Sequence, residues 1–283
     1  MDSTDAVPAA SAVPAASAVP APILAARGVS KVYGGQRGLG VRALADVDVS
    51  IAEGATVGIV GESGSGKSTL ARLLMALETP TTGEIRYRGE VVSGLPERRL
   101  RSFRRRVQIV FQDPMSSLDP RMRVHDILAE PLRALDAGDE RTRVPELLDA
   151  VGLPRTSARL YPHEFSGGQR QRIAIARALG PMPEVLVADE PVSALDVSVR
   201  AQILNLLKRL IGEFSLTLVF ISHDMAVVRH LCDEVVVLYR GEIVETGETD
   251  QIYARPRHEY TRALLAAVPA LGHLPTPPDG AAA

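Results

Sequence analysis

A glycine-rich segment, GESGSGKST at 61–69, has the residue types and spacing that bind nucleotide phosphates. Gly61, four further residues and then Gly66-Lys67-Ser68 match the Walker A pattern, between an apolar run at 56–61 and a helical pattern at 68–78. Glycines let backbone N–H groups and the helix N-terminus approach a phosphate closely. We expect Lys67 to reach the β- and γ-phosphates and Ser68 to bind Mg²⁺. The nucleotide-contacting residues expected here are Gly61, Glu62, Ser63, Gly64, Ser65, Gly66, Lys67, Ser68 and Thr69.

Two acidic residues end the apolar run VLVADEP at 185–191. Carboxylates at the end of a buried strand are costly unless a positive charge lies nearby, and Mg²⁺ beside the glycine-rich loop would supply it. We expect Asp189 to hold the metal or its water, and Glu190 to orient and polarise an attacking water molecule. A surface turn is the alternative interpretation of such a pair taken alone.

Two more polar residues follow apolar runs. His223 comes after 216–221, and Gln112 comes after 107–111. The carboxyl ends of parallel strands form the edge at which such sheets bind ligands. We therefore expect His223 to contact the γ-phosphate and Gln112 to lie beside it. The predicted catalytic residues are Glu190, His223, Lys67 and Gln112, and the predicted Mg²⁺ ligands are Ser68, Gln112 and Asp189.

A second helix start in the chain resembles a phosphate site but is incomplete. In EFSGGQRQRIAIARAL at 164–179, Ser166, Gly167, Gly168 and Gln169 open a helix whose N–H groups and dipole could receive phosphate. The segment has no lysine and no Mg²⁺ ligand, so we predict that it completes a site on another molecule. The simpler alternative is an ordinary helix N-cap formed by Ser166.

The elements that must position these residues indicate an α/β fold. The pattern of alternating apolar and polar residues predicts half-exposed strands at 23–33 and 43–54 and a hairpin at 83–92. Apolar runs predict buried strands at 56–61, 107–111, 185–189, 216–222 and 234–247, and a helix is predicted at 197–214. Strands alternating with helices predict a mostly parallel sheet that is covered on both faces. Residues from about 113 to 179 have a helical pattern and are predicted to be an insertion into this sheet.

Composition argues against several kinds of partner and site. The formal net charge of −2 gives no electrostatic reason to expect nucleic acid or an anionic membrane as a partner. Cys232 is the single cysteine, so it cannot form an internal disulfide or a cysteine-based metal cluster. No apolar run reaches the length of a membrane span. The Ala/Pro-rich start at 1–22 and the end at 272–283 are expected to be flexible tails, with no secretory signal.

Taken together, these motifs resemble those of the ATP-binding subunits of ABC transporters, across about 23–271. The resemblance is carried by Walker A, Gln112, FSGGQ at 165–169, Asp189-Glu190 and His223 in that order. It implies a P-loop NTPase cassette at 23–255 with a RecA-like core, an N-terminal antiparallel β subdomain and a helical subdomain at about 113–179. It also implies two cassettes stacked head to tail, with ATP and Mg²⁺ between one Walker A loop and the SGGQ segment of the other. By the same likeness Tyr33 would stack on adenine, and Asp196 would lie at the dimer seam.

A narrower resemblance is to the oligopeptide/dipeptide importer branch, particularly its second ATPase subunit. It is carried by the segments 107–122, 161–179, 189–207 and 256–269, although Phe165 replaces the leucine of the commonest LSGGQ signature. The branch implies a C-terminal element at 256–271 and uptake of peptides or similar small solutes. It also implies two membrane permease subunits, a sister ATPase or a second copy as dimer partner, an extracytoplasmic solute-binding protein that acts indirectly, and a location on the cytoplasmic face of the membrane.

Three other functions remain open from the sequence. The basic cluster RRLRSFRRR at 98–106 would suit a soluble ABC ATPase acting on nucleic acid or ribosomes, although we interpret it as a solvated helix. A P-loop kinase for small molecules would not need SGGQ or a glutamate directly after Asp189. A purely regulatory nucleotide-binding module would lack ATPase activity.

Overall fold

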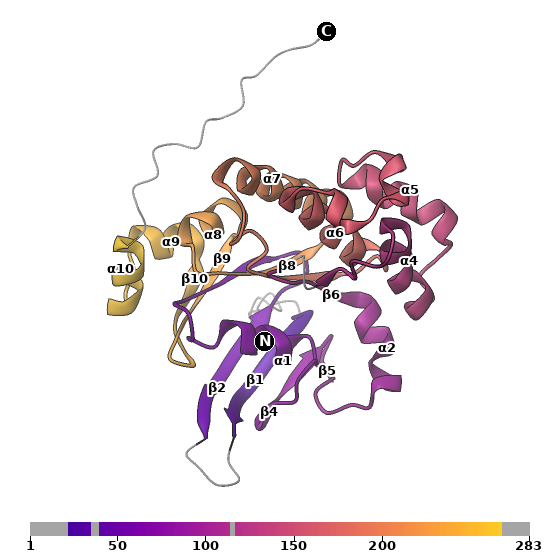
Figure 1. Cartoon of the computed structure of the whole chain (residues 1–283). Helices are drawn as coiled ribbons and strands as arrows, with labels where there is room; N and C mark the ends of the chain where they lie inside the picture. The colour runs from indigo at the N-terminus through magenta and orange to yellow at the C-terminus, as the bar shows by residue number, and fades with distance from the viewer. Residues whose placement is uncertain (1–21, 35–39, 114–116, 268–283) are drawn as a thin grey trace, which may run out of the picture.

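The computed structural model describes residues 22–34, 40–113 and 117–267. The predicted tails at 1–22 and 272–283 lie outside these residues, apart from Pro22. Two sheets lie in separate layers, and helix α1 (Lys67–Leu74) lies between them (Figure 1). No helix in the described part of the chain is both long enough and apolar enough to cross a bilayer.

The central sheet has the strand order β10-β9-β3-β8-β7-β6. Its five parallel strands are β3 (Thr56–Val60), β6 (Val107–Val110), β7 (Val185–Asp189), β8 (Thr217–Ser222) and β9 (Glu234–Tyr239). The edge strand β10 (Glu242–Glu248) is antiparallel to β9. Every residue of β3, β7 and β8 is buried, as is expected of parallel strands that are covered on both faces. The predicted mostly parallel sheet is therefore confirmed.

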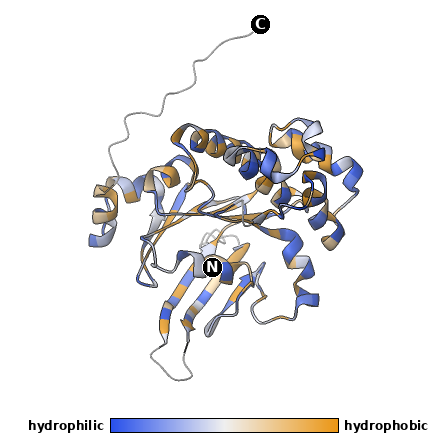
Figure 2. Cartoon of the chain, in the orientation of Figure 1, coloured by the Kyte–Doolittle hydropathy of each residue, from blue (hydrophilic) through white to orange (hydrophobic). Residues whose placement is uncertain are grey.

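Alternate residues along these strands enter two different cores. One face packs on α1 and on an antiparallel sheet of order β2-β1-β4-β5, formed by β1 (Leu24–Tyr33), β2 (Val41–Ile51), β4 (Thr82–Tyr87) and β5 (Glu90–Val91). The predicted hairpin is β4–β5, and its turn residues Arg88 and Gly89 both have positive φ, as a type I′ turn requires. Figure 2 shows hydrophobic residues along the strands of both sheets, where the two layers face each other.

The other face of the central sheet packs on helices. The helical block comprises α4 (Val124–Leu135), α5 (Glu140–Ala150), the short 3₁₀ helices at Arg155–Arg159 and Pro162–Glu164, and α6 (Gly167–Leu179). The helices α7 (Val197–Phe214), α8 (Met225–Leu231) and α9 (Thr249–Ala254) complete this layer, and α10 (Glu259–Ala266) lies beyond α9 (Figure 1). Helix α7 has the predicted boundaries. Cys232 is buried between α8 and β9, and burial raises the pKa of its thiol.

The basic cluster lies on helix α2 (Glu97–Arg106), which leads into β6. Only Leu100 and Phe103 of this helix are buried, and its arginines are exposed or half-buried. Arg104 pairs with Glu97 on the same helix, and Arg106 pairs with Glu184 before β7. The interpretation of this segment as a solvated helix is confirmed.

Candidate functional site

A cavity of about 730 Å³ opens at the carboxyl ends of strands β3 and β8. These two strands are hydrogen-bonded neighbours, so the residues that follow each of them come together. The glycine-rich loop forms one wall, and the residues after β6, β7 and β8 form another. The lining residues are Val41, Arg42, Ala43, Glu62, Ser63, Gly64, Gly66, Lys67, Ser68, Thr69, Gln112, Glu190 and His223.

The glycine-rich loop is packed too tightly at two positions to accept a side chain. A Cβ atom at Gly61 would lie 2.2 Å from the Leu238 carbonyl oxygen, and one at Gly66 would lie 2.6 Å from the Ala43 carbonyl oxygen. Gly66 also has φ of 107° as the N-cap of α1. The glycines of the motif therefore allow the loop to press against β2 and β9.

The Lys67 ammonium group is buried at the floor of the loop. Its Nζ donates hydrogen bonds of 2.8 Å to the carbonyl oxygens of Gly61 and Glu62. Burial lowers the pKa of Lys67, and the carboxylates of Glu190 and Asp189 oppose this shift. The lysine is thus a partly desolvated cation, and any anion that reached it would be bound more strongly than in bulk water.

Asp189 and Ser68 are in contact below the cavity. The Ser68 hydroxyl donates to Asp189 Oδ1 at 3.2 Å, and burial raises the pKa of the Asp189 carboxyl. A hydroxyl, a carboxylate and the nearby amide of Gln112 are the hard oxygen donors that Mg²⁺ accepts alongside phosphate oxygens. The donor set at this position therefore fits Mg²⁺, and the assignment of the three ligands stays a prediction.

Glu190 lies at the centre of the polar residues that face the cavity. Its Oε2 is 3.2 Å from His223 Nδ1 and 3.4 Å from Gln112 Nε2. The backbone of Glu190 has φ of 45°, in the left-handed region, and its N–H donates to the Ile221 carbonyl of β8. The structure thus brings Lys67, Gln112, Glu190 and His223 to one cavity, while their catalytic roles stay predictions.

Tyr33 lies outside the residues that line this cavity. It ends β1, and its hydroxyl donates to Glu78 Oε2 at 2.6 Å. The adenine-stacking role stays a prediction. Sequence reasoning missed Val41, Arg42 and Ala43, because a lining formed by the start of a half-exposed strand has no local signal.

Ser166 is the N-cap of α6, as the simpler interpretation of this segment expects. Its Oγ accepts from the Gln169 N–H at 3.3 Å, and Gln169 Oε1 accepts from the Ser166 N–H at 3.0 Å, which forms a capping box. Among the described residues that line the cavity beside the glycine-rich loop, none comes from 166–169. Ser166, Gly167, Gln169 and Asp196 are exposed, so they remain accessible to a second molecule.

The start of α6 packs directly against the start of α7. A Cβ atom at Gly168 would lie 2.4 Å from Val199 Cγ1, whereas one at Gly167 would lie 3.7 Å from its nearest neighbour, Leu195 Cδ2. Val199 is β-branched and therefore has few alternative rotamers. The close contact at Gly168 packs the start of α6 against the start of α7, next to the exposed residues Ser166 and Asp196.

We expect Gly168→Ala to lower the free energy of unfolding by about 1–3 kcal/mol, because the new methyl group overpacks the contact with Val199. Gly167→Ala is the matched control, since its methyl group meets only an ordinary van der Waals contact. Urea denaturation of both variants measures the difference. The pair Gly168→Ala with Val199→Ala should recover most of the loss. Equal stability of Gly168→Ala and the wild type would contradict the packing argument.

Comparison with known proteins was consistent with this geometry. The sequence pattern described as "ABC transporter" matches residues 44–193, and the pattern "Oligopeptide/dipeptide transporter, C-terminal region" matches residues 244–278. The di/tripeptide transport ATP-binding protein DppF of Pseudomonas aeruginosa is 49% identical over 264 residues, which cover 90% of this chain and 82% of DppF. The oligopeptide transport ATP-binding protein OppF of Lactococcus lactis is 49% identical over 234 residues, which cover 82% of this chain and 73% of OppF.

The fold of this chain is similar to that of solved ATP-binding cassettes. The ATP-binding cassette MJ0796, in a dimeric post-hydrolysis state bound to ADP and Pi, has a TM-score of 0.72 and 33% identity, covering 80% of this chain and 98% of MJ0796. The protein cbiO1 from Clostridium perfringens, part of the ABC transporter complex cbiONQ, has a TM-score of 0.72 and 28% identity, covering 83% of this chain and 92% of cbiO1.

Proposed function

Because the chain belongs to the ABC transporter family of ATP-binding proteins, we propose that it is the ATP-hydrolysing subunit of an importer for peptides or similar small solutes. One observation carries the ATPase part: a Walker A loop, a strand-end glutamate and a strand-end histidine face a single cavity. The solute class rests on the oligopeptide/dipeptide-type C-terminal region and on the names of the relatives. We also propose the division into a cassette at 23–255, with a helical subdomain at about 113–179, and a C-terminal element at 256–271.

In this proposal the phosphates of ATP lie against the loop from Gly61 to Thr69 and accept hydrogen bonds from its N–H groups other than that of Glu62, which donates within the protein. Lys67 moves its ammonium group from the loop carbonyls to the β- and γ-phosphates, and its burial strengthens that contact. Tyr33 stacks on the adenine. Ser68, Asp189 and Gln112 would hold Mg²⁺, which would neutralise phosphate charge.

Glu190 is proposed to orient the water that attacks the γ-phosphorus. Its carboxylate accepts a hydrogen bond from that water, which increases the electron density on the attacking oxygen. His223, 3.2 Å from Glu190, holds the glutamate and contacts the γ-phosphate. The water oxygen forms a bond to the γ-phosphorus while the bond from the γ-phosphorus to its bridging oxygen breaks. Glu190 accepts the proton that the water loses and passes it to solvent, and the products are ADP and phosphate.

A second cassette completes the site in this proposal. Ser166, Gly167, Gly168 and Gln169 of one cassette contact ATP held by the other, and Asp196 lies at the seam. Binding of ATP favours the closed dimer and hydrolysis favours the open one, so the two nucleotide states can drive a transport cycle. The exposure of Ser166 and Asp196, before the adjoining starts of α6 and α7, supports this arrangement. We propose a sister ATPase as the partner, with a second copy of this chain as the alternative.

The other proposed partners are two permease subunits, contacted at the cytoplasmic face of the membrane, and an extracytoplasmic solute-binding protein that acts through them. Purification of the chain from its native membranes in mild detergent, followed by mass spectrometry and an ATPase assay, tests this assembly. Recovery of two multi-spanning proteins with a second ATPase, together with ATP turnover, is the expected result. Recovery of ribosomal proteins or nucleic acid without a permease would overturn the transporter proposal, and absence of turnover in an intact complex would overturn the ATPase proposal.

A further inference from the structure

Helix α10, in the C-terminal element, makes a hydrogen bond to the phosphate loop. The backbone N–H of Glu62 donates to the Tyr260 hydroxyl at 2.8 Å, across 198 positions of sequence. Glu62 is the second residue of the glycine-rich motif and lines its cavity. A side chain from outside the matched ABC transporter segment at 44–193 thus contacts the loop that faces the nucleotide cavity.

The peptide unit that Tyr260 contacts is also bound by the motif lysine. The N–H of Glu62 and the carbonyl of Gly61 belong to the same planar peptide group. Tyr260 accepts from the N–H side at 2.8 Å, and Lys67 Nζ donates to the carbonyl side at 2.8 Å. Hydrogen bonds at both ends of one peptide group polarise each other and fix the orientation of its plane.

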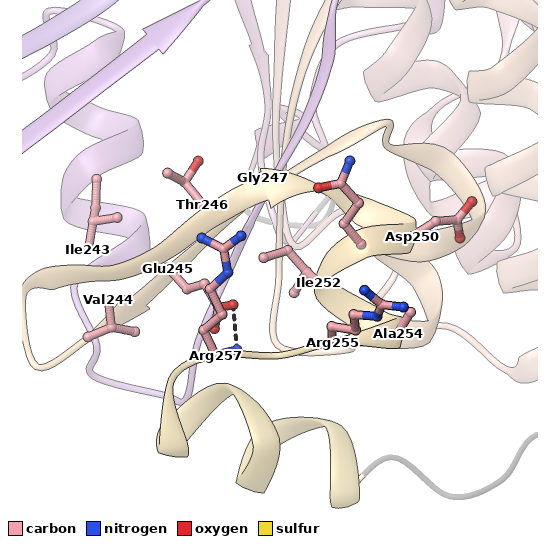
Figure 3. Close-up of a pocket in the computed structure, with 11 residues that line it drawn as sticks. Ile243, Val244, Glu245, Thr246, Gly247, Asp250, Ile252, Ala254, Arg255 and Arg257 are labelled. Carbon is pink, nitrogen blue, oxygen red and sulfur yellow. Dashed lines mark hydrogen bonds between the residues drawn. The ribbon is translucent and has the colours of Figure 1, made fainter.

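Tyr260 is itself held firmly in place. Its ring is buried and stacks on Tyr239 of β9 with centroids 4.1 Å apart. The segment that leads into α10 is anchored by Glu245 of β10, whose carboxylate accepts from the N–H groups of Arg257 at 2.8 Å and His258 at 3.0 Å. Figure 3 shows the first of these bonds, at the point where the chain turns from α9 towards α10. The Tyr260 hydroxyl is therefore presented to the loop by a rigid support.

We propose that Tyr260 is a positioning residue of the nucleotide site. It holds the first peptide group of the glycine-rich loop in the orientation that receives ATP. The inference rests on the proposed function, since it takes the loop as the ATP site. A loop held in its binding conformation loses less freedom when the ligand arrives, so the contact increases affinity for nucleotide.

Tyr260→Phe removes the hydroxyl and keeps the buried ring and its stacking on Tyr239. We expect the Kd for ATP to rise about three- to tenfold, since one hydrogen bond contributes a small free energy. At saturating ATP the kcat should change less than about twofold, because the loss acts on binding before the chemical step. Titration calorimetry with ATP and Mg²⁺ measures Kd, and the ATPase assay of the intact complex separates KM from kcat.

Tyr253→Phe is the matched control. Tyr253 lies on α9, and its hydroxyl donates to the Met225 backbone carbonyl, so the control removes a tyrosine hydroxyl bond in the same region without touching the loop. Its melting temperature should fall about as far as that of Tyr260→Phe, while its ATP affinity stays at the wild-type value. Equal ATP affinity in both variants and the wild type would overturn the inference. A wild-type chain that binds no ATP would instead overturn the proposed function.

Amide exchange of the wild type tests the contact without any substitution. The Tyr260 hydroxyl accepts the hydrogen bond from the Glu62 N–H, so exchange of this amide reports on the contact. We expect the nucleotide-free chain to show exchange at Glu62 slowed at least about tenfold relative to a free amide, because exchange requires the hydrogen bond to open. An unprotected Glu62 amide would overturn the inference even if Tyr260→Phe failed to fold.

Discussion

Replacing Glu190 by Gln should lower ATP turnover by about 10²–10⁴-fold, the usual contribution of a general base. Glutamine keeps the shape of the side chain and its contacts with His223 and Gln112, which lie within 3.4 Å of Glu190 Oε2. A neutral amide cannot polarise water as a carboxylate does. ATP binding should be unchanged, and the dimer should persist with ATP because hydrolysis no longer releases it.

Steady-state turnover, calorimetric ATP affinity and gel filtration with ATP measure these three effects. Glu213→Gln is a suitable control, because Glu213 is exposed on α7 and pairs only with Arg209 in the described contacts. Turnover of Glu190→Gln within about tenfold of the wild type would show that another group supplies most of the catalysis.

The second large effect is expected from Lys67→Met. Methionine has a similar length and lacks the charge, so the phosphates lose a charge-assisted contact at a partly desolvated site. We expect ATP affinity to fall about 10- to 100-fold, which corresponds to the few kcal/mol of a hydrogen bond to a charged group. Turnover should fall further, because the lysine also stabilises charge that develops on the phosphates.

Calorimetry and the ATPase assay measure both losses, and Lys208→Met on the exposed side of α7 controls for the loss of a lysine elsewhere. Urea denaturation should show that Lys67→Met remains folded. Wild-type ATP affinity in this variant would contradict the role assigned to the ammonium group.

The polar residues after the strands of the cavity were predictable because each is adjacent to a strong local signal. Glu190 and His223 directly follow strand-like apolar runs, and parallel topology brings those strand ends together without knowledge of any side-chain contact. Helix α7 was predicted with its observed boundaries because its apolar periodicity is long and uninterrupted.

Two other features, the turn between β9 and β10 and the contact of Tyr260, were not predicted. The run 234–247 has the composition of one strand, but it folds as β9 and β10 joined at Arg240-Gly241, where both residues have positive φ. The reversal was not predicted, although the identical segment Tyr-Arg-Gly-Glu at 87–90 was predicted to form the turn between β4 and β5. The contact of Tyr260 with Glu62 leaves no local pattern, because it arises only after α10 has docked. The sequence neighbours of Tyr260 are typical of a surface helix.

The left-handed backbone of Glu190 has a consequence for the engineering of this chain. At φ of 45° a residue with a side chain is strained by about 1–3 kcal/mol, and glycine relieves that strain. Stabilising substitutions are easy to find at strained functional positions, and their cost is activity. A library of variants selected only for survival of heating should therefore become enriched in glycine at position 190. The most heat-resistant clones would then hydrolyse almost no ATP.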